Sequence, residues 1–289
     1  MRSPEEMLKM ILNRAEQDER IRAVTMEGSR ANPNAVHDEF SDFDICYYVR
    51  DVREFVCDHS WINCFGDIMI VQRPDDCYKE PYDYESRGNY AYLMQFADGN
   101  RIDLHLVDVK DMPLEADNTE PRVVLLNKDG FKDLIPLDSE AAFYIKKPVE
   151  QEFFDTVNEF RWLAAYITKG LCRDELCYAK HAYDVTQAAM FMKMLDWKVG
   201  ADNDFSVTTG AHGKYLKRFL SDAEMKRLRD TFPNGAYDDI WDKLIKRYDW
   251  FAEIAEELAG RFGYEFDGYE SKRVRDFVLE RFEKYKENR

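Results

Sequence analysis

The spacing of apolar residues changes once along this 289-residue chain, close to Lys146-Lys147-Pro148. Before that point, short apolar runs that alternate with polar residues are separated by turn residues, which is typical of β-strands. After it, long stretches repeat their apolar residues with the period of an α-helix. The sequence therefore predicts an α+β protein, with a mixed-sheet domain at 1–147 followed by a helical bundle at 148–289.

The individual elements are expected where these runs lie. Strands are expected at 21–26, 43–49, 68–71, 90–96, 101–109 and 123–126, and helices of the second domain at 150–168, 174–195, 221–231, 237–258 and 271–285. A first helix is expected from Pro4 to about Gln17, because Ser3 and Glu6 have the spacing of a capping box. Asp98-Gly99 between two expected strands predicts a hairpin.

The chain is strongly acidic, with 41 Lys and Arg against 57 Asp and Glu and a formal net charge of −16. Such a surface repels a phosphate backbone and attracts a small cation, although acidity also serves solubility alone, so we expect no nucleic-acid partner. Membrane-spanning and signal-peptide patterns are missing, so we expect no membrane partner and a cytoplasmic location. The cysteines lack metal-site spacing and are expected to be free thiols: Cys46, Cys57, Cys64, Cys77, Cys172 and Cys177.

Gly28-Ser29-Arg30 ends one expected strand, and Asp42 and Asp44 surround the start of the next. Alternate residues of a strand share a face, so the two carboxylates project together and repel each other unless a cation lies between them. Mg²⁺ binds one or two carboxylates together with substrate phosphates. Gly28 lets the backbone approach a phosphate closely, and the Ser29 hydroxyl and nearby amides suit phosphate oxygens. The pattern predicts a magnesium site for a triphosphate.

Asp103 is a third acid, in an expected strand whose apolar residues occupy the other face. A carboxylate in an apolar strand is costly without a partner, so we expect Asp103 to complete the carboxylate cluster near an attacking hydroxyl. Ordinary explanations stay open: aspartates also cap turns, Asp103 can be a half-exposed surface acid, and Arg30 can pair with another surface acid. His105 is expected to point away from Asp103 and to be structural, and Trp162 and Tyr166 are expected in the core.

The order of these motifs resembles the polymerase-β-like nucleotidyltransferase superfamily: Gly-Ser, then Asp-x-Asp on the next strand, then a single Asp on a later strand. More narrowly, the chain is similar to the bacterial aminoglycoside 6-adenylyltransferases over about residues 1–264. The segments that carry this resemblance are Val24 to Arg30, Phe40 to Ile45, Phe65-Gly66, Asp98 to Leu104, Phe153 to Glu159, Lys169 to Leu171 and Gly213 to Leu220. The resemblance implies a polymerase-β-like domain and a helical domain that together transfer AMP from Mg-ATP to the 6-hydroxyl of streptomycin, releasing pyrophosphate and inactivating the antibiotic.

Position by position, the resemblance implies that Ser29 and Arg30 contact the triphosphate and that Asp42 and Asp44 bind Mg²⁺. It also implies that Asp103 is the third carboxylate of the metal cluster and the general base. Matching segments of the second domain supply further implied nucleotide ligands: Lys169, Lys214 and Tyr215.

Streptomycin carries guanidinium groups, which pair with carboxylates in a bidentate manner. Acids of the second domain are therefore candidate acceptor ligands: Asp174, Glu175 and Asp184. The same chemistry also suits another acceptor, such as a different aminoglycoside, a lincosamide or a protein hydroxyl. A non-catalytic module with this fold is a further alternative, against which the presence of all three aspartates argues. We expect a monomer.

Overall fold

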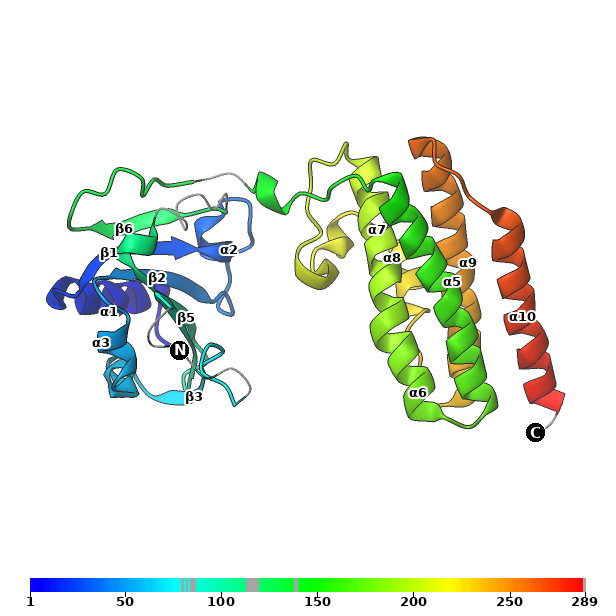
Figure 1. The fold of residues 1–289 in the computed structure, drawn as a ribbon, viewed down its shortest axis with the longest axis horizontal. Coiled ribbons are helices and arrows are strands. Elements are labelled where there is room, and N and C mark those ends of the chain that lie inside the picture. Colours follow the sequence, from blue (N-terminus) through cyan, green and yellow to red (C-terminus); the bar gives the residue numbers. More distant parts are fainter. Residues whose placement is uncertain (79–80, 82, 84–86, 113–119, 138–139, 288–289) are drawn as a thin grey trace. The chain divides into compact units, whose positions relative to one another are not determined.

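The computed structural model describes residues 1–78, 81, 83, 87–112, 120–137 and 140–287. The chain forms two compact units, Met1–Ala142 and Phe143–Arg289 (Figure 1). The division lies a few residues before the boundary expected after residue 147. The segment between these two points belongs to the second unit, where Ile145 N donates a hydrogen bond of 2.9 Å to Val207 O.

The first unit contains a six-stranded mixed sheet, as predicted (Figure 1). Its strands are β1 (Ile21–Glu27), β2 (Phe43–Val49), β3 (Ile68–Gln72), β4 (Asn89–Phe96), β5 (Arg101–Asp108) and β6 (Val123–Asn127). They lie in the order β3-β4-β5-β2-β1-β6; β2 and β5 pair in parallel, and the other neighbours pair antiparallel. Because β2 and β5 are parallel, both strands start at the same edge of the sheet, where Asp42 and Arg101 also lie.

The two faces of this sheet differ in what covers them. Phe43, Ile45 and Tyr47 of β2 point into the larger core, which also includes residues of α1 (Pro4–Gln17), α3 (Arg53–Val56) and η1 (His59–Phe65). The opposite face carries a smaller apolar cluster that includes Cys46 and Tyr48. That cluster lies toward the ends of β2 and β5, so the same face is left polar at the starts of these two strands.

Helix α1 covers the larger core and has the predicted capping box. Ser3 Oγ accepts a hydrogen bond from Glu6 N, and Glu6 Oε2 accepts one from Ser3 N at 2.7 Å. Met7 and Ile11 on the apolar side of the helix are fully buried. The helix is thus fixed at its start by its own cap and along its length by hydrophobic packing.

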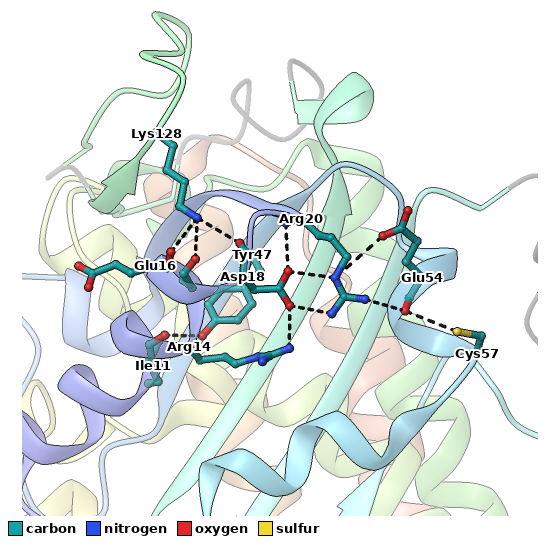
Figure 2. A network of polar contacts seen from close by, with 10 residues as sticks. Ile11, Arg14, Glu16, Asp18, Arg20, Tyr47, Glu54, Cys57 and Lys128 are labelled. Atoms are coloured by element: carbon teal, nitrogen blue, oxygen red, sulfur yellow. Dashed lines mark hydrogen bonds and ion pairs between the residues drawn. The ribbon is translucent and has the colours of Figure 1, made fainter.

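At its other end, α1 is held by the polar network in Figure 2. Lys128 Nζ donates to main-chain carbonyls at the end of the helix, the nearest at 2.8 Å. Asp18 forms ion pairs with Arg14 at 2.7 Å and with Arg20 at 2.6 Å. The buried hydroxyl of Tyr47 donates to a further carbonyl of α1 at 2.6 Å. These contacts join α1 to β1, to β2 and to the segment after β6.

The second unit is the predicted helical bundle (Figure 1). Its α-helices are α5 (Glu150–Cys172), α6 (Leu176–His181), α7 (Ala188–Asp202), α8 (Asp222–Arg229), α9 (Tyr237–Phe262) and α10 (Gly268–Glu287), and η4 (Ala182–Gln187) is a π-helix. Its short 3-10 turns are η5 (Ala211–Gly213) and η6 (Leu216–Arg218); η2 (Val109–Asp111) belongs to the first unit, and η3 (Ala141–Phe143) lies at the division between the two units.

The prediction of a single α-helix at 174–195 is wrong, because this segment is divided into α6, η4 and α7. Asp174 lies in a turn with a φ of 59°, and the π-helix η4 separates α6 from α7. Arg247, which is buried, donates from Nη1 to the main-chain oxygen of Tyr183 at 2.8 Å and stacks on the Tyr183 ring at 3.5 Å. A carbonyl inside η4 is therefore satisfied by a distant side chain, and the periodicity of the local sequence does not reveal such a contact.

Within the residues that the structure describes, no helix combines the length and the apolar character needed to cross a lipid bilayer. Cys57, Cys64, Cys77, Cys172 and Cys177 are exposed free cysteines, and Cys46 is a buried free cysteine in β2.

Candidate active site

Three acids stand in one row across three neighbouring strands. The antiparallel pairing of β1 with β2 places Glu27 opposite Asp44, and the parallel pairing of β2 with β5 places Asp44 opposite Asp103. All three belong to the face of the sheet that the larger core leaves free, because Phe43 and Ile102 point into that core. The sequence had singled out Asp44 and Asp103 but not Glu27, whose place in the row depends on strand register.

Asp42 lies one residue before β2, next to this row. Burial alternates along this segment, since Phe43 is fully buried and Asp42 and Asp44 are half-buried, so the two aspartates belong to the same face. In the neighbouring strand, Arg101 immediately precedes the residue paired with Phe43. The sheet edge thus brings together two aspartates and an arginine from segments far apart in the sequence.

Arg101 forms ion pairs with two of the predicted carboxylates. Its Nε and Nη2 donate to the two carboxylate oxygens of Asp103, each at 2.7 Å. Its Nη1 lies 3.5 Å from Asp42 Oδ2. Arg101 thus contacts two acids of this edge, and the sequence had not indicated a role for it.

The Asp44 carboxyl is partly buried and lies close to other acids. Burial raises the pKa of Asp44 to about 6, and the negative charges of Asp103 and Asp42 add to the rise, while His105 and Arg101 oppose it. His105 lies two residues after Asp103 on β5, so it shares the face of Asp103 and is exposed there. The expectation that His105 points to the other face is therefore wrong. The carboxylates repel one another, which is the condition that a bound cation relieves.

The donor set suits Mg²⁺ in its chemistry. Hard carboxylate oxygens are the ligands that this ion prefers, and it takes one or two of them when substrate phosphates supply others. As the side chains stand in the described part of the chain, no three His, Cys, Asp or Glu residues are spaced to hold one ion. Asp42 and Asp44 offer carboxylates for such a site, although Arg101 lies 3.5 Å from Asp42 and binds both oxygens of Asp103.

Gly28 begins the short helix α2 (Gly28–Ala31) directly after β1. Its φ is +64°, and a Cβ at this position would lie 1.9 Å from Asp44 Oδ2. The absence of a side chain therefore makes room for the Asp44 carboxylate, a reason that the sequence did not show. Ser29 follows in the first turn of α2 and is half-buried.

Arg30 holds the backbone that leads into β2. Its Nη2 donates to Ser41 O at 2.7 Å, its Nε donates to Asp42 O at 3.0 Å, and its guanidinium stacks 3.9 Å from the centre of the Phe43 ring. These contacts fix the main chain at Asp42. The structure thus engages Arg30 in positioning this aspartate, whereas the resemblance implied a contact with triphosphate.

The other end of the acid row also has an arginine. Arg122, which is buried, lies 3.2 Å from Glu27 Oε1 through its Nε, and Thr25 Oγ1 donates to the same oxygen at 3.3 Å. Burial raises the pKa of the nearby Glu120, and the charge of Glu27 adds to this. Glu27 is therefore held in place from β1 and from the segment before β6.

The predicted residues of the second unit fall into separate places. Lys169 lies in the last turn of α5, with its Nζ 5.7 Å from the Tyr166 ring. Asp174 and Glu175 lie in the turn from α5 to α6, where the Asp174 carboxylate raises the pKa of the Tyr237 hydroxyl. Asp184 lies in η4 and pairs with Lys180 at 2.8 Å.

Lys214 and Tyr215 follow η5, in the loop after α7. The Lys214 Nζ lies 4.9 Å and the Arg218 guanidinium 3.9 Å from the centre of the Tyr215 ring. Figure 1 shows this loop near the start of α5, in agreement with the hydrogen bond that Ile145 N donates to Val207 O. Helix α6 lies near the other end of α5, where Lys169 is located. The structure therefore does not bring Lys214 and Tyr215 together with Lys169.

A hollow of about 660 Å³ lies in the second unit between α5 and α7, and the sequence had not indicated it. Its charged lining consists of Glu152, Asp155 and Glu159 from α5 and Lys193 from α7, which pairs with Glu152 at 2.6 Å. Carboxylates therefore predominate in this hollow, although one of them is already neutralised.

Two aromatic residues expected in the core lie at the surface instead. Trp162 is 60% exposed and Tyr166 is 36% exposed, with their ring centres 5.8 Å apart. Both lie on α5 three and seven residues beyond Glu159, which places them along one side of the helix. Helical spacing alone did not show that this side of α5 is exposed.

Comparisons with known proteins cover both units. A family model described as "Streptomycin adenylyltransferase" matches residues 1–281. Proteins described as aminoglycoside 6-adenylyltransferase from Bacillus subtilis (strain 168) and Campylobacter jejuni are each 33% identical to the chain, over 93% and 99% of it and over 95% and 98% of their own lengths. A crystal structure of an aminoglycoside 6-adenyltransferase from Bacillus subtilis aligns with 98% of this chain and 99% of its own, with 29% identity and a TM-score of 0.48.

Proposed function

The chain belongs to the streptomycin adenylyltransferase family, and from this we propose that it transfers AMP from Mg-ATP to the 6-hydroxyl of streptomycin. In this reaction the hydroxyl oxygen attacks the α-phosphorus of ATP and forms a phosphodiester bond. The bond between that phosphorus and the oxygen bridging to the β-phosphate breaks, and pyrophosphate leaves. The acceptor hydroxyl loses its proton to a base, and the modified antibiotic is inactive.

The observation that carries this proposal is the carboxylate row at the starts of β2 and β5. Asp42 and Asp44 would hold Mg²⁺, which neutralises charge on the carboxylates and phosphates when bound. Asp103 lies opposite Asp44 and is the proposed general base for the acceptor hydroxyl. The raised pKa of Asp44 supports the assignment of this cluster as a catalytic cation site, because perturbed pKa values concentrate at functional sites.

The segment after β1 is the proposed phosphate-binding turn. Ser29 would donate its hydroxyl to a phosphate oxygen, and the absence of a side chain at Gly28 leaves the Asp44 carboxylate close to this turn. The bonds from Arg30 to two main-chain oxygens support a role in orienting Asp42. A direct contact of Arg30 with triphosphate would require these bonds to break.

Nucleotide contacts from the second unit are proposed for Lys169, Lys214 and Tyr215. Lys214 and Tyr215 adjoin each other and together offer a cation and an aromatic ring. Lys169 lies elsewhere in the bundle, at the end of α5. A shared nucleotide site for all three therefore has less support than the adjacent pair.

Acceptor contacts are proposed for acids of the second unit, because a guanidinium group binds a carboxylate through two parallel hydrogen bonds. Asp174, Glu175 and Asp184 were expected from the sequence, and Asp184 is already paired with Lys180. The hollow with Glu159 and Asp155 offers a second set of carboxylates. Separate charge-neutral substitutions in the two sets would show which one changes the KM for the acceptor.

The acceptor itself is tested by pyrophosphate release from Mg-ATP by the purified protein, with and without streptomycin. We expect release that depends on streptomycin. Release with a different aminoglycoside, a lincosamide or a protein substrate in place of streptomycin would assign the same chemistry to another acceptor. No release with any of them, at any metal concentration, would contradict the catalytic assignment. A cytoplasmic location and a monomeric state stay predictions from the sequence.

A further inference from the structure

Arg101 occupies the position that a metal ion would need if Asp103 were one of its ligands. Both oxygens of Asp103 accept a hydrogen bond from its guanidinium at 2.7 Å, and Nη1 extends toward Asp42 at 3.5 Å. The bidentate arrangement is the strongest kind of arginine–carboxylate contact. The same two carboxylates are assigned to metal binding and catalysis under the proposed function, on which this inference rests.

The guanidinium and a divalent cation cannot neutralise the same oxygens of Asp103 at the same time. Two positive groups within a few ångströms of each other repel strongly at a half-buried site. The Asp103 side chain is 15% exposed, so water screens this repulsion only in part. The Arg101 side chain is 38% exposed and lies at the sheet edge, so it is in contact with solvent.

We propose that Arg101 is an exchangeable counter-cation: its guanidinium and the metal compete for Asp103 and Asp42, and binding of the metal with ATP moves the guanidinium onto a phosphate oxygen. The exchange keeps the charge of the site nearly balanced, because the metal replaces the arginine at the carboxylates while the phosphates bring new negative charge. Guanidinium suits both partners, since its fork of donors matches carboxylate and phosphate alike. Once released, Asp103 has a free oxygen for the acceptor proton.

The experiment compares wild type with Arg101→Gln in titrations of Mn²⁺ followed by electron paramagnetic resonance, first without nucleotide. Removing the competing charge should tighten Mn²⁺ binding by about tenfold. The affinity for ATP in the presence of Mg²⁺, measured by calorimetry, should fall by about tenfold, because the phosphate loses a charged donor. Arg101→Lys keeps the charge without the fork and should give intermediate changes in both affinities.

A purely structural role for Arg101 predicts the opposite sign for the metal, because disordered carboxylates bind Mn²⁺ more weakly. Equal or weaker Mn²⁺ binding by Arg101→Gln would therefore overturn the inference, as would unchanged ATP affinity. Arg53→Gln is the matched control, since Arg53 forms an exposed bidentate pair with Asp51 and should leave both affinities as in wild type. Thermal unfolding of each variant shows that it is folded.

The failure of this inference is distinguishable from failure of the proposed function. If the proposed metal site is wrong, wild type and variant alike bind no Mn²⁺ in the absence of nucleotide. If only the role of Arg101 is wrong, wild type binds Mn²⁺ and releases pyrophosphate when the acceptor is present, and Arg101→Gln binds Mn²⁺ equally or more weakly. These binding measurements need neither turnover nor the identity of the acceptor.

Discussion

The two ends of β1 carry charge clusters of opposite kinds. At the start of the strand, Asp18 is paired with both Arg14 and Arg20, so this carboxylate has two cationic partners (Figure 2). At its end, Glu27 stands in a row with Asp44 and Asp103, so acids outnumber the cations. The pKa of Asp18 is lowered, chiefly by its hydrogen bonds with Arg20, whereas burial and like charges raise the pKa of Asp44.

The difference separates a cluster that stabilises the fold from one that is prepared for a ligand. Around Asp18 each charge is satisfied within the chain, and the network fixes α1 to the sheet. Around Asp44 the chain leaves an excess of negative charge in a partly buried place, which costs stability until a cation binds. Substitutions in the first cluster should therefore affect stability, and those in the second should affect activity.

Asp103→Asn should have the largest effect on activity. The amide keeps the shape of the side chain but cannot accept the acceptor proton, so kcat should fall by about 10³-fold. The affinity for Mg-ATP, measured by calorimetry, should change far less than after Asp42→Asn, which removes a proposed metal ligand. Near-normal kcat in Asp103→Asn would remove this residue from the catalytic list.

Asp18→Asn should have the largest effect on stability. It leaves Arg14 and Arg20 without their carboxylate, and the free energy of unfolding should fall by about 2 kcal/mol near neutral pH. Because the pKa of Asp18 is lowered from 3.8, this stabilisation is present above pH 3.8 and is lost as the pH falls below it. Urea titrations should show that the difference in free energy of unfolding between wild type and Asp18→Asn disappears at acidic pH. The kcat of the folded variant should equal that of wild type. A loss of kcat would contradict the assignment of this cluster to stability alone.

Asp44→Asn should have the opposite sign on stability. The folded pKa of about 6 lies above the unfolded value of 3.8, so the native state holds its proton longer and wild type loses stability as the pH rises from 3.8 through 6. Above that window Asp44→Asn should be more stable than wild type, by about 2 kcal/mol at most, and less active. If the difference in free energy of unfolding between Asp44→Asn and wild type is the same at pH 4.5 and at pH 7.5, without divalent metal, the raised pKa of Asp44 is contradicted.

Gly28→Ala should have the smallest effect of the set on stability, but a specific one on activity. Alanine at a φ of +64° costs about 1 kcal/mol, and its Cβ would also displace the Asp44 carboxylate, so kcat should fall by about tenfold. Gly130→Ala is the matched control, because Gly130 has a φ of +66° with nothing within 4 Å of an added Cβ. If the two variants are equally active, the contact between Gly28 and Asp44 has no part in catalysis.

Local patterns were sufficient to predict most of the fold. The strand at Phe43–Val49 was predicted to the residue because polar residues bound an apolar run, and the capping box at Ser3 and Glu6 set the start of α1. Asp42, Asp44 and Asp103 were assigned to one site from motif order and family resemblance. In the structure Asp44 and Asp103 lie opposite each other in parallel strands, and Asp42 lies one residue before β2.

Contacts between distant segments could not be predicted in the same way. Glu27 joins the row only through the register of β1 with β2, and the hydrogen bonds of Arg30 depend on how residues 32–41 return to the sheet. The main-chain oxygen of Tyr183 in the π-helix accepts a hydrogen bond from the buried Arg247, 64 residues away. In each case a side chain or strand far along the sequence decides the local structure.

The central claim is that the carboxylate row serves AMP transfer to an aminoglycoside. It is tested most directly by the mass of streptomycin after incubation with the protein and Mg-ATP. We expect the antibiotic to gain one AMP unit with wild type and to stay unmodified with Asp103→Asn. An unchanged mass with wild type, under conditions where Mg-ATP is shown to bind, would contradict streptomycin as the acceptor.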